Sequence, residues 1–298
     1  GIPVPKYFKA VTIEEAYKAS KEIDFPVIVK PVDSQGSRGV KKVDNFVQLE
    51  HAFKDALKYS ANGSVIVEEY FKGNEVVIQG FIARGKFTNI SIGDRKYFNS
   101  DRLFIPSRTL FPSKIRKEHR EKLLQINKKL ITSINPSFGI SHSEYLINTE
   151  TGKLKLVEAA IRGGGVYISS DLVPMASGIN IGKLLIQNAI GEPTTEISTK
   201  KILNNASAYI CFYLPEGKVM AIKGRNEINR IQGVKKIYLG NVRVGADIEK
   251  MIDKTMRLGP ILIAGENRTE LDNIIQKIEN TLMIQVKTPT GEIGNIIW

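Results

Sequence analysis

The sequence predicts an α+β fold in which most strands pair as antiparallel hairpins. Between residues 65 and 92, runs rich in β-branched and aromatic residues are separated by short polar turns at 72–74 and 84–86. Amphipathic helices are expected outside these hairpins, at about 13–23, 46–57 and 114–134. A doubly wound parallel sheet would alternate strands and helices along the whole chain, and this sequence does not.

The individual elements follow from local signals. Thr12 and Glu15 form a capping box that begins the first helix, which ends before Pro26. In the second helix Phe46, Leu49 and Phe53 belong to one apolar stripe. The further elements are expected as strands at 27–31, 39–43, 65–71, 75–81 and 87–92, a polar loop at 93–113, a strand hairpin at 138–147 and 153–160, and a helix at 179–189. From about residue 200, three or four strands and a helix at 270–282 predict a separate small unit.

Composition limits the class of protein. The chain has 298 residues, of which 42% are hydrophobic and 25% charged, as is typical of a soluble globular protein. No apolar run approaches the roughly 20 residues of a membrane span. The single cysteine, Cys211, lies in an alternating apolar run, so we expect core packing, no disulfide and a reducing, cytoplasmic location. The chain begins without methionine or a signal peptide, so we expect a fragment.

A formal net charge of +12 raises the alternative of a nucleic-acid-binding protein. The clearest basic cluster, at 114–122, opens a helix whose apolar residues recur at helical spacing, so its charges belong to a solvated face. Aromatic residues are not interleaved with the basic ones, and no helix-turn-helix, zinc or RNP signature occurs. We therefore expect the charge to attract small anionic substrates, with no nucleic-acid or membrane partner.

A strand followed by a small-residue loop is the first candidate site. The apolar run at 27–29 leads into Lys30, and the loop contains Gly36, Ser37, Arg38 and Gly39. Glycines let successive backbone N–H groups approach phosphate oxygens, and Lys30 adds a full positive charge to the same anion. The spacing matches neither the Walker A nor the Rossmann pattern. A hairpin with an ordinary Gly/Ser turn is the alternative.

Two carboxylates form the second candidate site. If residues 148–152 make the turn of their hairpin, Glu144 and Glu158 face each other on adjacent strands. Like charges at such a position repel, and a divalent cation bound between them removes that cost. Arg162, followed by three glycines, places a guanidinium beside this pair, where charge develops in phosphoryl transfer. The alternative is that one of the two carboxylates points to solvent.

Over about residues 2–192 these elements, in this order, resemble the ATP-grasp enzymes, which include biotin carboxylase, D-alanine ligases, L-amino acid ligases and carbamoyl phosphate synthetase. The resemblance implies that Lys30 and the glycine loop bind phosphates, Glu144 and Glu158 bind Mg²⁺, and Arg162 steadies an acyl phosphate. It also implies a nucleoside site. The hinge whose backbone binds adenine consists of Glu68, Glu69, Tyr70 and Phe71. Glu75 is the acid that binds the ribose hydroxyls.

The resemblance implies two α+β subdomains that hold ATP between antiparallel sheets. We expect an ATP-grasp domain at 1–198, divided into a smaller lid subdomain at about 12–70 and a larger one at about 71–198, and a C-terminal α+β domain at 199–298. The implied activity is ATP-dependent joining of a carboxylate to an amine, a thiol or ammonia through an acyl phosphate. ATP and Mg²⁺, or Mn²⁺, are the implied cofactors, small-molecule carboxylate and amine substrates are the implied partners, and a homodimer is compatible. The branch resembled most is that of the L-amino acid ligases and carbamoyl phosphate synthetase.

The sequence departs from the family at two points, and the first, Ala160, favours a second interpretation, a regulatory or non-catalytic ATP-binding module. The family usually has an asparagine two residues after the second metal acid, and here that residue is Ala160, which has no oxygen ligand. We also expect that this sequence is a fragment without the family's N-terminal domain, which would precede residue 1, and that it binds ATP weakly and turns over slowly or not at all.

Roles for several polar residues stay open at this level. His142 is a substrate contact or an ordinary strand histidine, and Ser169 and Ser170 are substrate ligands or helix caps. Tyr97, Arg102 and Arg108 are candidates for binding a substrate carboxylate from the loop at 93–113.

Overall fold

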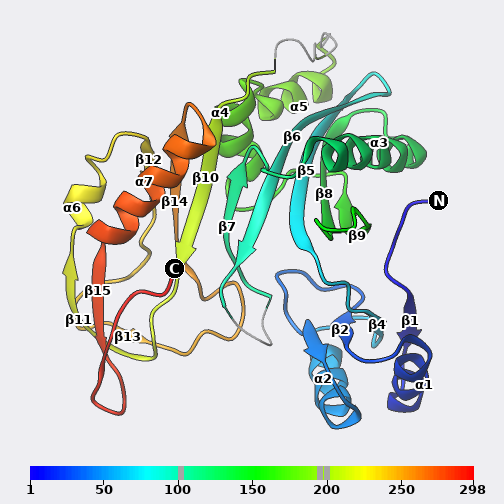
Figure 1. The fold of residues 1–298 in the computed structure, drawn as a ribbon, viewed down its shortest axis with the longest axis horizontal. Helices are drawn as coiled ribbons and strands as arrows, with labels where there is room; N and C mark the ends of the chain where they lie inside the picture. Colours follow the sequence, from blue (N-terminus) through cyan, green and yellow to red (C-terminus); the bar gives the residue numbers. More distant parts are fainter. Residues whose placement is uncertain (100–103, 193–196, 198–201) are drawn as a thin grey trace.

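The structure is a computed structural model that describes residues 1–99, 104–192, 197 and 202–298. It consists of a small unit near the amino terminus and a long twisted sheet that carries most of the other elements (Figure 1). All the strand pairings in these described residues are antiparallel. The predicted α+β class is therefore confirmed.

The small unit is a four-stranded sheet with two helices packed on one face. Its strand order is β1-β4-β2-β3, from β1 (Tyr7–Ala10), β4 (Val65–Glu69), β2 (Val27–Pro31) and β3 (Lys41–Val43). The helices are α1 (Ile13–Ile23), which begins with the capping box of Thr12 and Glu15, and α2 (Phe46–Lys58). Leu49 and Phe53 of α2 are buried against Val29, so the apolar stripe holds the unit together.

The long sheet has eight strands, drawn from both halves of the chain. Their order is β12 (Val234–Ile237), β14 (Leu258–Gly265), β10 (Ala206–Phe212), β7 (Pro106–Phe111), β6 (Lys86–Tyr97), β5 (Asn74–Ala83), β8 (Gly139–Ile147) and β9 (Leu154–Ala160). Because β10 pairs with β7 on one side and β14 on the other, the sheet continues across the predicted boundary at 198. That boundary remains a prediction.

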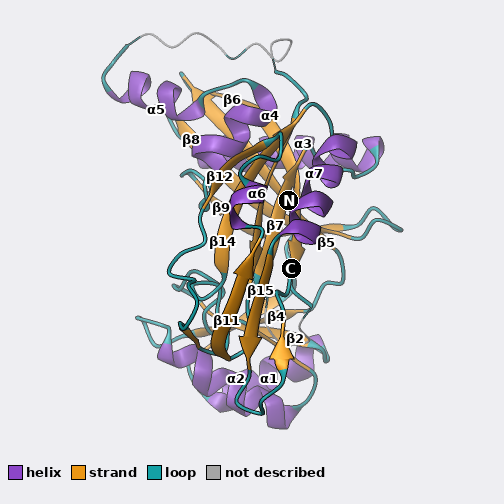
Figure 2. Ribbon diagram, turned by 90° about the vertical axis from the view of Figure 1, so that its left-hand side faces the viewer, coloured by secondary structure: helices purple, strands orange, loops and turns teal. Residues whose placement is uncertain are grey.

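Helices cover both faces of this sheet. On one face Leu123 of α3 (Lys117–Ile134) packs against Ile78 and Tyr145. On the other face a π-helical turn, η1 (Ile168–Leu172), is followed by α4 (Val173–Ser177) and α5 (Ile181–Ala189). Leu172 and Val173 are buried there against the strand residues of the second core. Figure 2 shows the two-helix unit and α5 at opposite ends of the molecule.

A third sheet lies in the last hundred residues, beside the end of the long sheet (Figure 1). Its order is β13 (Asp247–Ile248), β11 (Gly217–Lys223), β15 (Met283–Lys287) and β16 (Ile293–Gly294), and α6 (Arg225–Ile228) and α7 (Arg268–Thr281) accompany it. The predicted inward face of α7 is confirmed, since Leu271, Ile274, Ile275 and Ile278 are all buried. No helix in the described ranges is long and apolar enough to span a membrane.

The prediction of a loop at 93–113 is wrong for most of that segment. The strand β6 runs on to Tyr97, and β7 pairs with it through Asp94 and Leu110. Polar residues misled the sequence reading because their side chains are paired inside the protein, as Arg95 is with Glu75. Arg102 lies outside the described residues.

Candidate active site

The candidate site is built on one face of the strands β5, β6 and β8. Side chains alternate between the faces of a sheet, so Glu75 and Gln79 of β5 point the same way. The register sets His142 opposite Gln79 and Glu144 opposite Val77, which brings His142 and Glu144 onto this face as well. Arg95 of β6 completes it, with its Nη1 2.8 Å from Oε1 of Glu75.

Glu144 and Glu158 are directly opposed, as the position of their turn predicts. They are partners in the register of β8 and β9, just before a bulge shifts that register. Two side chains bond to the same oxygen of Glu144: His142, with Nε2 2.9 Å from Oε1, and Arg95. Glu158 is bonded instead by Arg162, at 3.2 Å. The structure therefore brings Glu144, Glu158 and Arg162 together.

Burial and neighbouring charges shift the pKa values of the two acids that contact Arg95, Glu75 and Glu144, in opposite directions. Burial raises the pKa of Glu75 to about 7, although Arg95 works in the opposite direction. Burial alone would also raise the pKa of Glu144, but Arg95 and the hydrogen bond from His142 outweigh it and hold that pKa below its ordinary value. At neutral pH Glu144 is thus the carboxylate that keeps its full negative charge.

Lys30 and the predicted hinge lie in the small unit. Nζ of Lys30 is 2.7 Å from Oε1 of Glu68, on the neighbouring strand β4. Glu69 ends that strand, with its carboxylate 3.3 Å from Nζ of Lys155. Tyr70 and Phe71 follow without regular secondary structure, so the segment that links the two units is the one predicted to bind adenine.

The glycine loop contains three residues in the left-handed region of backbone conformation. Gly36, Ser37 and Gly39 all have positive φ, of 80°, 59° and 69°. At Gly39 a side chain is also excluded by packing, because a Cβ there would lie 2.9 Å from the ring of Tyr59, the residue that follows α2. The fold therefore needs glycine at this position.

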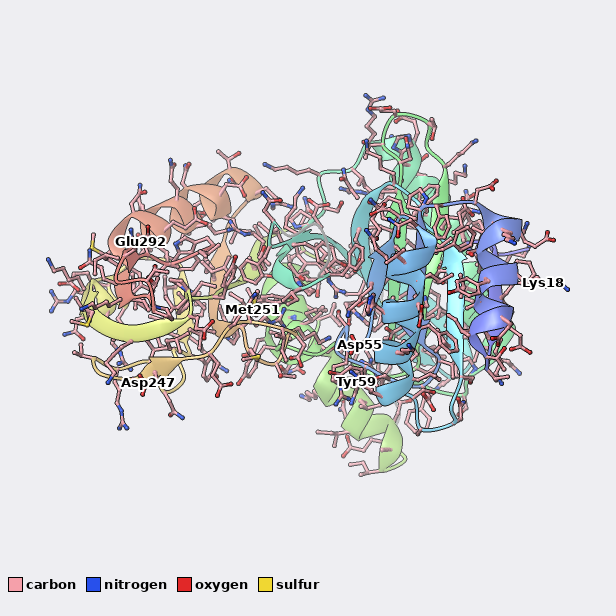
Figure 3. All side chains as sticks on the ribbon, turned by 90° about the horizontal axis from the view of Figure 1, so that it is seen from below. Lys18, Asp55, Tyr59, Asp247, Met251 and Glu292 are labelled. Carbon is pink, nitrogen blue, oxygen red and sulfur yellow. The ribbon has the colours of Figure 1, made fainter. Side chains whose placement is uncertain are left out.

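A lysine from the carboxyl-terminal part of the chain reaches this loop. Cε of Lys254 lies 3.5 Å from the position that a Cβ on Gly36 would occupy. Burial, with Arg257 and Arg95 nearby, lowers the pKa of Lys254, while Glu144 and Glu158 act against that shift. Figure 3 shows Met251, in the same segment, between the carboxyl-terminal unit and α2. Lys254 thus lies beside the glycine loop, and the charges of both acids influence its pKa.

Sequence reasoning missed two of these cations. Arg95 lies in a segment that was assigned to a loop, and its charge becomes significant only once β6 places it between Glu75 and Glu144. Lys254 has no motif around it and comes from the far end of the chain. His142 was left open, and its contact with Glu144 now gives it a place in the site. Glu75 has both oxygens occupied, by Arg95 and Tyr97.

The acid pair fits a divalent cation that is shared with phosphates. No group of three or more His, Cys, Asp or Glu residues suited to a metal occurs among the described residues, so the protein alone offers no complete cage. Mg²⁺ is typically held by one or two carboxylates together with nucleotide phosphates. Glu144 and Glu158 supply that number of carboxylates, from opposite positions of one hairpin.

Comparison with protein families agrees with this arrangement. The ATP-grasp domain model matches residues 23–170, which include the glycine loop, the acid pair and Arg162. The model of the L-amino acid ligase C-terminal domain 2 matches residues 210–287. The chain therefore belongs to the ATP-grasp family. Within that family, its second half carries the C-terminal domain found in L-amino acid ligases.

Individual relatives cover this chain well but are longer than it. A D-alanine–D-alanine ligase of Pseudomonas entomophila is 28% identical over 62% of this chain and 58% of its own length. The N-terminal section of the carbamoyl phosphate synthase large chain of Methanopyrus kandleri is 24% identical over 86% of this chain and 46% of its own length. The chain spans about half the length of these relatives.

Two solved structures share the fold. An L-amino acid ligase from Bacillus licheniformis superposes with a TM-score of 0.80 and 22% identity, over 95% of this chain and 68% of that one. A biotin carboxylase domain dimer of the Hydrogenobacter thermophilus 2-oxoglutarate carboxylase, in complex with MgADP, gives a TM-score of 0.71 and 19% identity, over 99% and 64%. At these identities the likeness concerns the fold.

Proposed function

We propose that this protein joins a carboxylate to an amine, using ATP and an acyl phosphate intermediate. A carboxylate oxygen of the first substrate attacks the γ-phosphorus of ATP, the bond to the bridging oxygen breaks, and ADP leaves. The nitrogen of the second substrate then attacks the acyl carbon and expels phosphate. The observation that carries the proposal is the opposition of Glu144 and Glu158 with Arg162 bonded beside them.

The chain's own residues position the reactants and balance their charge. The phosphates would be bound by Lys30, the glycine loop and Lys254. Lys30 would contribute its positive charge from a rigid strand, and the glycine loop its backbone N–H groups. The Cε atom of Lys254 is 3.5 Å from the position of a Cβ on Gly36, which places this side chain beside the glycine loop. Glu144 and Glu158 would hold Mg²⁺ or Mn²⁺, which would neutralise charge on the transferring group. Arg162 would contact the same group from the end of β9.

Nucleoside binding is proposed for the segment between the two units. The backbone N–H of Phe71 makes no hydrogen bond within the described ranges of the chain, so it is a donor free to bind adenine. Glu75 would accept the ribose hydroxyls on the lone pairs that its bonds from Arg95 and Tyr97 leave unused. A homodimer is proposed only by analogy with the biotin carboxylase domain.

A binding module without ligase activity is the second candidate, and Ala160 favours it. Ala160 lies opposite His142 in the register, two residues after Glu158. Its methyl group offers no oxygen to a second cation, so a reaction that needs two metal ions would lose one ligand.

Release of ADP separates the two candidates. We would incubate the protein with Mg-ATP and each of a panel of amino acids, alone and in pairs, and measure ADP. A ligase gives hydrolysis or product formation that a particular carboxylate stimulates, and Arg162→Met abolishes it. A binding module binds nucleotide but gives no stimulation by any substrate.

A further inference from the structure

A buried chain of hydrogen bonds connects the loop after Arg162 to Glu144. The backbone N–H of Gly164 donates to Oγ of Ser169, at 2.7 Å, and that hydroxyl donates to Oε1 of Gln79, at 2.8 Å. The amide of Gln79 in turn contacts Nδ1 of His142. Nε2 of His142 lies 2.9 Å from Glu144. We name this chain, Gly164, Ser169, Gln79, His142 and Glu144, the relay.

The direction of each hydrogen bond in the relay follows from its donors and acceptors. A backbone N–H can only donate, and an ionised carboxylate can only accept. Oε1 of Gln79 is occupied by Ser169, so its Nε2 faces His142 and donates to Nδ1. Nδ1 then carries no proton, and Nε2 carries the proton that is donated to Glu144. All the hydrogens point from Gly164, in the loop after Arg162, toward the carboxylate of Glu144.

Burial favours a single arrangement of the hydrogen bonds in the relay. Gln79 is 0% exposed, His142 is 3% and Ser169 is 8%. In such surroundings a donor or acceptor that loses its partner cannot turn to water instead, so the whole chain favours a single arrangement. Since His142 and Arg95 both bond to Oε1 of Glu144, the other oxygen of that carboxylate is left to face a cation.

The glycines after Arg162 are explained by the same contacts. A Cβ on Gly164 would lie 2.9 Å from Nδ1 of His142, and a Cβ on Gly163 would lie 3.0 Å from Oγ of Ser169. A Cβ on Gly165 would meet nothing within 4 Å. Two of the three glycines are thus required because the loop lies directly on the relay.

We propose that Gln79, His142 and Ser169 are positioning residues, which set the tautomer of His142 and thereby the orientation of Glu144 as a metal ligand. The metal-binding part rests on the proposed function, whereas the tautomer does not. Groups that hold a metal ligand in place commonly change metal affinity 10- to 100-fold when they are removed.

The first experiment needs neither metal nor nucleotide. The chain has three histidines, so ¹⁵N-histidine labelling and two-dimensional NMR can assign the tautomer of His142 against His142→Gln. We expect the Nε2-protonated form in the native protein, and a mixture of tautomers in Gln79→Met and in the milder Ser169→Ala. An Nδ1-protonated ring in the native protein, or an unchanged spectrum in both folded variants, would overturn the relay.

The second experiment measures Mn²⁺ binding by electron paramagnetic resonance, in the presence of a non-hydrolysable ATP analogue. Ser169→Ala and Gly164→Ala should weaken Mn²⁺ binding about 10-fold or more. The matched controls are Ser170→Ala, whose hydroxyl bonds only to Asp171 among the described residues, and Gly165→Ala, and both should bind as the native protein does. Equal Mn²⁺ affinity in Gly164→Ala and Gly165→Ala would refute the positioning role. Failure of the native protein itself to bind Mn²⁺ would refute the proposed function, while the NMR result would still decide the relay.

Discussion

Glu144 and Glu158 occupy opposite positions of one hairpin, and different cations balance them: Arg95 holds Glu144 and Arg162 holds Glu158. The contact of Glu144 is buried, whereas the side chains of Glu158 and Arg162 are each 53% exposed. The pair is therefore asymmetric, with one fixed carboxylate and one that can move to meet a ligand.

This asymmetry predicts the behaviour of Glu158→Gln. Because the contact with Arg162 is half exposed, we expect the free energy of unfolding without metal to change by less than about 1 kcal/mol. Stabilisation by Mg²⁺ with an ATP analogue should be lost. Urea unfolding with and without Mg²⁺ measures both quantities. Glu150→Gln, in the exposed turn of the same hairpin, is the control, and equal responses of the two variants would contradict this account.

Lys254→Met tests whether the carboxyl-terminal part completes the phosphate site. Removing a cation beside Gly36 should weaken binding of an ATP analogue about 10-fold, which corresponds to about 1.4 kcal/mol. Lys250→Met changes an exposed lysine four residues earlier and should leave affinity unchanged. Isothermal titration calorimetry compares them, and a normal affinity in Lys254→Met would exclude this residue from the site.

Removal of residues 199–298 should prevent cooperative folding. The deletion would leave the edge of β7 unpaired where β10 now lies, and it would uncover the core that Phe81 and Phe111 share with Tyr209 and Leu262. We expect a broad, non-cooperative urea transition by circular dichroism. A truncated chain that unfolds cooperatively and binds ATP would instead support an independent domain ending near 198.

Cys211 predicts a loss of stability in alkaline solution. Burial raises the pKa of its thiol to about 11 from an ordinary value of 9.0, so the folded protein keeps a proton that the unfolded chain releases. Because the folded-state pKa is raised, the contribution of the Cys211 thiol to the free energy of unfolding is complete below pH 9. It falls as pH rises toward 11. Between pH 8 and 10.5 the native protein should lose about 2 kcal/mol relative to Cys211→Ala. Parallel pH profiles of urea unfolding would show no such difference if the thiol were accessible.

Local patterns predicted much of the fold. The capping box of Thr12 and Glu15 marked the start of α1, and the turn after Ile147 predicted that Glu144 and Glu158 lie close to opposite positions, a pairing that the bulge next to Glu144 completes. Both features depend on residues close together in the sequence, so the pattern contains the information. The same holds for the inward face of α7.

Contacts distant in the sequence could not be predicted in this way. The pairing of β7 with β10 joins residues about one hundred positions apart, and nothing near Arg108 or Ile210 encodes it. Arg95 and Lys254 likewise reach the site only through the tertiary fold. No partner for their charges can be identified from the sequence, so the basic composition predicted attraction of small anions but not which cations lie in the site.

The most direct test of the nucleotide site is the thermal midpoint of the protein with and without Mg-ATP, beside Lys30→Ala and Glu158→Ala. At a ligand concentration 100 times the dissociation constant, binding should stabilise the native protein by about 2.7 kcal/mol, which raises the midpoint by several degrees. We expect that shift in the native protein and its loss in both variants. No shift in the native protein at millimolar Mg-ATP, or an equal shift in all three, would contradict the nucleotide site proposed for Lys30, Glu144 and Glu158.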